Sequence, residues 1–80
     1  MNTAVNNIKI DTEYITLGQF LKFTTIAPSG GMVKAILQDY KISVNDVEEN
    51  RRGKKLYPGD KISVRKVGDY RIIKNDNKNT

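Results

Sequence analysis

The densest group of chemically active side chains is a run of cations, Arg51-Arg52-Gly53-Lys54-Lys55. Four positive charges in five residues favour contact with phosphate, because guanidinium groups bind two oxygens at once and ammonium groups act as point charges. If each cation neutralised one phosphate, log affinity for a nucleic acid would fall with log salt at a slope of about −2.8 to −3.6. The alternative is a solvated loop without a ligand, since residues 48–55 have no apolar side chain and must be exposed.

A second candidate for phosphate contact is the turn Pro28-Ser29-Gly30-Gly31. It lacks the glycine spacing and the Gly-Lys-Ser/Thr ending of a nucleotide-binding P-loop, which favours a glycine-rich helix start. Backbone N–H groups at a helix start bind phosphate oxygens, and Gly30 and Gly31 would let a nucleic-acid backbone come close. The turn is therefore a candidate for contact with a nucleic acid and not with a nucleotide cofactor.

Catalytic chemistry has little support in the sequence. The chain has no histidine and no cysteine, which excludes Ser-His triads, thiolate zinc sites, disulfides and cysteine nucleophiles. The adjacent carboxylates Glu48 and Glu49 would point to opposite faces of a strand and would not share a site. We therefore expect a protein that is not an enzyme and that has no cofactor and no metal.

The charge of the chain is unevenly distributed. The 80 residues carry a formal net charge of +5, from 14 basic and 9 acidic side chains. Residues 1–50 hold four basic and six acidic groups, whereas residues 51–74 hold nine basic and two acidic groups. Basic charge concentrated in one part of a domain is typical of nucleic-acid binders, and a basic surface kept only for solubility is the alternative.

The length and the hydropathy pattern indicate one small domain. A chain of 80 residues leaves no room for a second core. No apolar run approaches the ~18 residues that span a bilayer, and residues 1–10 lack the basic region and apolar stretch of a signal peptide. We therefore expect a cytoplasmic protein with no membrane partner.

Two helices are predicted to position the candidate residues of the first half. Thr16 and Gln19 have the spacing of a capping box, which starts the first helix. This helix should end before Pro28, because the residue before a proline avoids helical geometry. The turn at residues 29–31 opens the second helix, whose apolar stripe is predicted to consist of Met32, Val33, Ile36, Leu37 and Tyr40.

A small antiparallel sheet is predicted after the helices. Residues 42–44 alternate in hydropathy and lead into a hairpin turn at Asn45-Asp46, from which Val47 starts a return segment. Pro58-Gly59 fits the centre of a type II turn. The remaining elements follow in order: a strand over 62–67, a turn at Gly68-Asp69 and a last strand over 70–73.

These patterns predict an α+β domain with two short helices packed on a small antiparallel sheet. The domain is expected over residues 16–74. An N-terminal strand or arm is expected over residues 1–15, with the strand itself near 5–10. The polar residues from Lys74 onward have no reason to order, so residues 75–80 are expected to be a disordered tail.

The run from Thr16 to Val64 resembles the S4 RNA-binding domain, also called the alpha-L motif. The residues that carry the resemblance are Leu17, Leu21, Ser29, Lys34, Ile36, Ile42-Ser43-Val44-Asn45 and Pro58-Gly59-Asp60-Lys61-Ile62. Within that family the chain is similar to the small stand-alone YaaA-like proteins. Their Gly-Gly-Met and Asn-Arg-Arg-Gly-Lys-Lys-Leu-Tyr-Pro-Gly-Asp motifs match residues 30–32 and 50–60.

The resemblance implies a non-catalytic domain that contacts structured RNA, ribosomal RNA or a stem-loop, through a basic surface. The expected RNA-binding residues are Gln19, Lys22, Gly30, Gly31, Lys34, Lys41, Asn45, Arg51, Arg52, Lys54 and Lys55. The chain departs from the family at Gly18, Gly30, Tyr40 and Asp46, which weakens the usual helix-borne contacts and leaves part of that role to the basic loop.

The same resemblance leaves open a partner other than RNA. Relatives of the small type are encoded among DNA replication and repair genes. A protein-interaction adaptor, or a DNA-associated accessory protein in replication or repair, is therefore the alternative to an RNA-binding protein. The protein partner would accordingly be a replication, repair or ribosome-associated protein.

Overall fold

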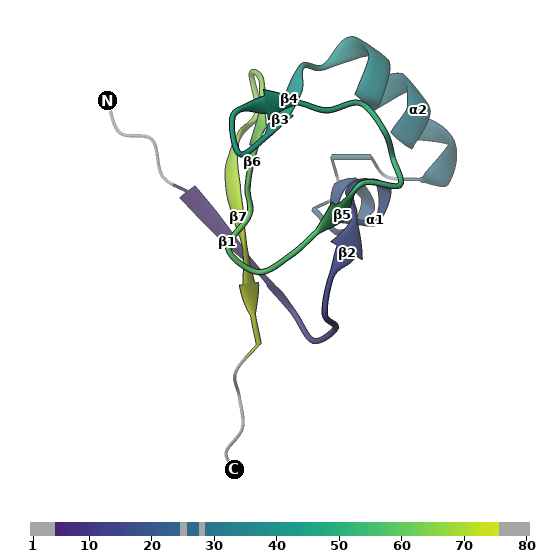
Figure 1. Cartoon of the computed structure of the whole chain (residues 1–80). Helices are drawn as coiled ribbons and strands as arrows, with labels where there is room; N and C mark the ends of the chain where they lie inside the picture. Colours follow the sequence, from purple (N-terminus) through teal and green to yellow (C-terminus); the bar gives the residue numbers. More distant parts are fainter. Residues whose placement is uncertain (1–4, 25, 28, 76–80) are drawn as a thin grey trace.

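The computed structural model describes residues 5–24, 26–27 and 29–75. Its helices are α1 (Leu17–Phe23) and α2 (Gly30–Asp39) (Figure 1). Its strands are β1 (Val5–Ile10), β2 (Ile15–Thr16), β3 (Ile42–Val44), β4 (Val47–Glu48), β5 (Lys55–Leu56), β6 (Lys61–Val64) and β7 (Gly68–Lys74). This composition confirms the predicted α+β class.

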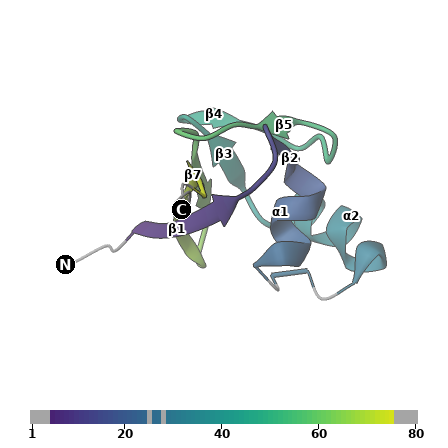
Figure 2. The same ribbon diagram turned by 90° about the horizontal axis from the view of Figure 1, so that it is seen from below.

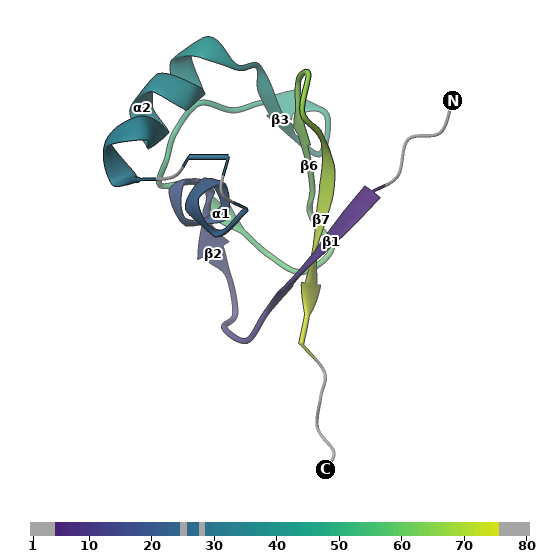
Figure 3. The same cartoon turned by 180° about the vertical axis from the view of Figure 1, so that it is seen from behind.

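The main sheet is mixed rather than purely antiparallel. Its strand order is β1-β7-β6-β3-β4, and the pairs from β7 to β4 are antiparallel as predicted. The edge strand β1 pairs parallel with β7, so that Ile10 lies opposite Lys74 (Figure 3). The hydropathy pattern did not indicate this direction, because β1 and β7 lie at opposite ends of the chain and no turn connects them.

A separate two-stranded ribbon joins the start of α1 to the basic loop. In this ribbon β2 and β5 pair antiparallel, with Ile15 opposite Leu56 and Thr16 opposite Lys55. The segment between β4 and β5 arches from the main sheet toward the helices and returns beside α1 (Figure 1). The ribbon therefore brings the cations predicted to bind phosphate next to the helix pair.

The core lies between the helix pair and one face of the main sheet (Figure 2). Phe20 of α1 is fully buried and packs edge-to-face on Tyr70 of β7, with ring centroids 5.2 Å apart. The buried apolar residues are Ile10, Leu17, Phe20, Leu21, Ala27, Val33, Ile36, Leu37, Ile42, Val44, Leu56, Ile62, Val64 and Ile72. Helices and sheet thus share one core, as expected of a small α+β domain.

The predicted stripe of α2 is narrower than expected. Val33, Ile36 and Leu37 are buried, but Met32 is 44% exposed and Tyr40 is 37% exposed. Met32 lies at the edge of the stripe in the first turn. Tyr40 is the C-cap in an extended conformation (φ −107°, ψ 139°), so it leaves the helical face on which the periodicity placed it.

Two of the predicted turns are confirmed by their backbone angles. Asn45 and Asp46 have φ values of 52° and 71°, the left-handed geometry that a tight two-residue hairpin turn requires. Gly59 has φ 101°, and the Asp60 N–H donates to the Tyr57 carbonyl at 2.9 Å across the type II turn. Both turns place polar residues at the same end of β3 and β6.

The turn predicted at Gly68-Asp69 is wrong by a few residues. The chain turns at residues 65–67, where Lys66 has φ 71° and the Val67 N–H donates to the Val64 carbonyl at 3.0 Å. Gly68 already pairs with Val64 in the ladder between β6 and β7. The glycine therefore starts a strand, while a lysine takes the left-handed position.

The two ends of the described chain are joined by hydrogen bonds. The Asn75 N–H donates to the Ile10 carbonyl at 2.8 Å, and its side-chain amide donates to Asp11 Oδ1 at 2.7 Å. Lys74 ends β7, one residue beyond the predicted last strand, and Asn75 of the predicted tail is hydrogen-bonded to the end of β1 and to Asp11. Residues 76–80 of the predicted tail lie outside the described residues, and the division at residues 15 and 16 stays a prediction.

Candidate nucleic-acid interface

The start of α1 is fixed by the predicted capping box. The Gln19 N–H donates to Thr16 Oγ1 at 3.2 Å, and the Thr16 N–H donates to Gln19 Oε1 at 2.9 Å. The reciprocal pair satisfies two backbone donors that a helix start otherwise leaves unpaired. Gln19, predicted to touch RNA, thus uses its side-chain oxygen within the domain.

The basic loop is held against α1 by its main chain. The Leu17 N–H donates to the Lys54 carbonyl at 2.8 Å, and the Gly18 N–H donates to the Arg52 carbonyl at 2.9 Å. A Cβ at Gly18 would lie 3.4 Å from both Cβ and the carbonyl oxygen of Arg52, at the limit of ordinary van der Waals contact, so the loop lies directly against Gly18. Because main-chain atoms make these contacts, the side chains of Arg52 and Lys54 are not needed to hold the loop against α1.

Arg51 is engaged by a carboxylate of the same loop. Its Nε donates to Glu49 Oε2 at 2.8 Å, and its Nη2 donates to Glu49 Oε1 at 3.2 Å. These hydrogen bonds lower the pKa of Glu49 from 4.5 to about 2, and the same pairing raises the pKa of Arg51. Glu49 therefore balances part of the charge of Arg51, and contact of Arg51 with a phosphate stays a prediction.

The two lysines of the loop lie in different surroundings. Lys54 is half-buried beside the start of α1, where its carbonyl accepts a hydrogen bond from the Leu17 N–H. Lys55 lies in β5, and its ammonium is 5.0 Å from the centroid of the Tyr14 ring, within the range of a cation–π contact. The four cations that looked equivalent in the sequence thus have four different environments.

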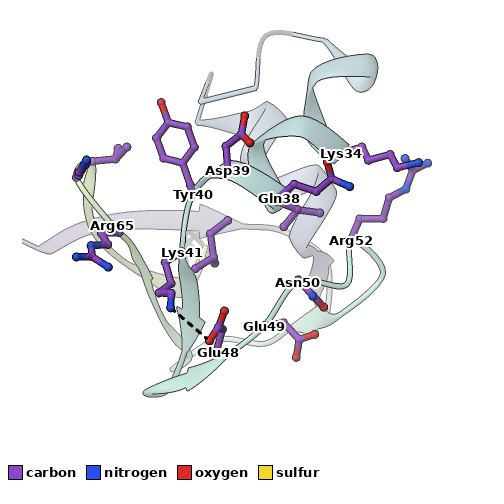
Figure 4. Close-up of a pocket in the computed structure, with 14 residues that line it drawn as sticks. Lys34, Gln38, Asp39, Tyr40, Lys41, Glu48, Glu49, Asn50, Arg52 and Arg65 are labelled. Carbon is purple, nitrogen blue, oxygen red and sulfur yellow. Dashed lines mark ion pairs between the residues drawn. The ribbon is translucent and has the colours of Figure 1, made fainter.

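A broad open groove of about 1040 Å³ lies beside the C-terminal end of α2 (Figure 4). It is bounded by the end of α2, the start of β3, the segment after β4 and the turn between β6 and β7. The polar and charged residues that line it are Lys34, Gln38, Asp39, Tyr40, Lys41, Glu48, Glu49, Asn50, Arg52, Arg65 and Lys66.

Positive charge exceeds negative charge in this groove. Lys41 forms an exposed ion pair with Glu48 at 3.9 Å, and Glu49 is bound by Arg51. The cations of the groove without a carboxylate within 4.0 Å, among the described residues, are Lys34, Arg52, Arg65 and Lys66. In Figure 4, Lys34 and Arg52 lie at one edge of the groove and Arg65 at the opposite edge.

A smaller depression of about 170 Å³ lies between the starts of the two helices. It is lined by Thr16, Gly18, Gln19, Lys22, Gly30, Val33 and Arg52. Three residues predicted as helix-borne contacts, Gln19, Lys22 and Gly30, therefore meet at one place. Arg52 lines this depression as well as the groove, so the basic loop and the helix pair share a surface.

The remaining predicted residues lie outside both depressions. Gly31 is exposed in the first turn of α2. Asn45 donates through Nδ2 to Asp60 Oδ1 at 3.0 Å and accepts from the Lys61 N–H at 3.0 Å. The amide of Asn45 therefore ties the hairpin turn to the start of β6.

Arg65 and Lys66 were not among the predicted site residues. The sequence pattern assigned them to a strand, whereas the structure places them in the turn that borders the groove. Two adjacent cations between Val64 and Gly68 would have indicated an exposed basic turn, had the turn been placed before the glycine rather than at it.

Comparison with known proteins identifies the class. The family model described as the S4 domain matches residues 8–73 of this chain. The chain therefore belongs to the S4 domain family, a family of RNA-binding domains, which confirms the resemblance found in the sequence.

A relative of similar length is known in a bacterium. The "Probable ribosome maturation protein RlbA" of Bacillus subtilis (strain 168) is 48% identical to this chain over 68 residues. The aligned part covers 85% of this chain and 96% of that protein, so the likeness extends over most of both chains. Neither helix of the described chain is long and apolar enough to cross a membrane.

Proposed function

We propose that this domain binds structured RNA, ribosomal RNA or a stem-loop, and acts as a binding module without catalysis. The observation that carries the proposal is the position of Arg52, which lines both the groove beside α2 and the depression between the helix starts. One continuous basic surface can follow an RNA backbone over several phosphates, whereas an isolated loop could contact one or two.

The arrangement of the free cations supports binding to a folded RNA. Lys34 and Arg52 at one edge of the groove and Arg65 at the other are placed to contact phosphates of two different backbone segments. Double-stranded RNA is recognised mainly by the shape of its backbone and by its 2′-hydroxyl groups. A concave surface with cations at both edges suits such a ligand.

The relative supports a partner in the ribosome. A protein of nearly the same length, 48% identical, is named for ribosome maturation. We infer that this domain acts on ribosomal RNA or on a ribosome-associated assembly, which would place it in the cytoplasm.

A salt titration on a hairpin RNA tests the proposal. The variant replaces Arg52, Arg65 and Lys66 by alanine, and the slope of log affinity against log salt should flatten by about 2.1 to 2.7. The matched control replaces Lys9, Lys61 and Arg71, three cations of the main sheet that line neither the groove nor the depression. Equal slopes for the two variants, or no binding of hairpin RNA by the wild type, would contradict the proposal.

The nature of the nucleic acid is tested with DNA. A DNA hairpin of the same sequence has a different groove shape and lacks the 2′-hydroxyl groups, so it should bind more weakly at every salt concentration. If the two hairpins bound with equal affinity, the domain would bind phosphate backbones in general and would not recognise RNA. This is the result that a DNA-associated protein would give.

A further inference from the structure

The outward face of the β2–β5 ribbon carries a cluster of aromatic and basic side chains. Leu56 is fully buried, so the residues on either side of it, Lys55 and Tyr57, face away from the core. Tyr14 and Tyr57 flank the ribbon, with ring centroids 5.6 Å apart and planes at 48°. The Lys55 ammonium lies over the Tyr14 ring. The proposed function does not use this cluster.

The ring of Tyr57 is both exposed and fixed at its base. Its N–H donates to Asp60 Oδ2 at 2.8 Å, and its carbonyl accepts from the Asp60 N–H at 2.9 Å. Pro58 and Gly59 complete the turn that these bonds close. These bonds fix the main chain of Tyr57, and 47% of the residue is exposed, so the turn presents an aromatic side chain on a fixed backbone.

The cluster continues the basic surface already described. Thr16 lies opposite Lys55 in the ribbon and also lines the depression that Lys22 and Arg52 border. A strand of RNA that leaves the depression past Thr16 would therefore reach Lys55 first and the tyrosine rings next.

We propose that Tyr14, Lys55 and Tyr57 form a stacking platform for an unpaired base that flanks the structured RNA. Lys55 covers a face of Tyr14, so Tyr57 supplies the accessible ring for the base, and the Lys55 ammonium meets the neighbouring phosphate. Aromatic rings bind unpaired bases by stacking, with little dependence on sequence, and a basic group beside them holds the backbone. This inference rests on the proposed function, since it adds a single-stranded extension to the same ligand.

The test compares a blunt hairpin RNA with the same hairpin carrying three unpaired uridines at one end. The extension should raise the affinity of the wild type about 5- to 150-fold, the range expected for stacking of one base. Tyr57→Leu should remove this gain and still bind the blunt hairpin like the wild type. Tyr57→Phe keeps the ring and should keep the gain. Phe23→Leu removes an aromatic ring that is 62% exposed on α1, away from the platform, and should also keep it.

A second measurement needs no variant. With 2-aminopurine in place of one unpaired base, stacking on the platform should quench its fluorescence when wild-type protein binds. Absence of any gain from the extension, retention of the gain in Tyr57→Leu, or unquenched fluorescence in the complex would overturn the platform. In each of these cases binding of the blunt hairpin would leave the proposed function intact. If the wild type bound neither hairpin, the proposed function and the platform would fail together.

Discussion

The Asn45-Asp46 turn and the basic loop are both polar, exposed and linked to a distant segment, but they are linked by different atoms. Asn45 is tied to Asp60 and Lys61 through its side-chain amide. The loop is tied to α1 through the carbonyl oxygens of Arg52 and Lys54. In the first region the side chain maintains the fold, and in the second the side chain stays available for a ligand.

This difference separates structural from functional polar residues better than residue type does. A side chain already bound inside the domain would have to break those bonds to meet RNA, and replacing it should reduce stability. A side chain whose own backbone makes the structural bond can be replaced with little cost to the fold. Replacing Arg52 should therefore affect binding, whereas replacing Asn45 or Asp60 should affect folding.

The largest effect on stability should come from Asp60. Its carboxylate accepts from the Asn45 amide and from the Tyr57 N–H, so Asp60→Ala should lower the free energy of unfolding by about 1–3 kcal/mol. Asp39→Ala removes the same charge from an exposed position and is the control. Urea denaturation of both variants measures the difference, and equal midpoints would refute a structural role for the Asp60 bonds.

A smaller loss is expected at Gly59. Its φ of 101° is strained for a β-branched residue, so Gly59→Val should lower the free energy of unfolding by about 1 kcal/mol. Gly53 in the basic loop has no such angle, and a Cβ there would meet no atom within 4 Å. If Gly53→Val lowered the melting temperature as much as Gly59→Val, the two regions would not differ in backbone strain.

The Glu49–Arg51 pair should give the basic loop a pH dependence. The pKa of Glu49 is lowered from 4.5 to about 2, so the pair stabilises the fold fully above pH 4.5. This contribution is lost as the pH falls from 4.5 toward 2. Wild type should therefore lose more stability over that window than Glu49→Gln, measured by denaturation at pH 6, 4 and 2.5. Parallel losses in the two proteins would show that the pair contributes nothing.

The smallest effect is expected at Lys41. Its pair with Glu48 is 3.9 Å long, and both side chains are more than half exposed. Exposed pairs of this kind contribute little, so Lys41→Ala should change the free energy of unfolding by less than about 0.5 kcal/mol. A larger loss would mean that Lys41 supports the hairpin as Asn45 does.

Features with a local physical cause could be predicted from the sequence. The capping box needs only Thr16 and Gln19 three residues apart, and the Asn45-Asp46 and Pro58-Gly59 turns follow from the backbone preferences of their own residues. The resemblance to S4 domains also rested on contiguous motifs and is confirmed.

Features that depend on distant pairing could not be predicted in the same way. The parallel partner of β1 and the meeting of Arg52 with the helix pair arise only when the chain is folded. The pairing of Arg51 with Glu49 was missed for a different reason. The two residues are close in sequence, but the charge count treated all four loop cations as equal.

The parallel pairing of β1 with β7 has a consequence for how the protein is made. Each residue of β1 pairs with one that follows 64 positions later, so β1 has no partner until β7 has been synthesised. Contacts between residues so far apart in sequence form slowly, because the entropy cost of closing a long loop comes before the stabilisation that the contacts provide. Until β1 pairs with β7, the Ile10 side chain, which is buried in the folded domain, remains exposed to solvent. β1 can therefore join the sheet only after β7 has been synthesised.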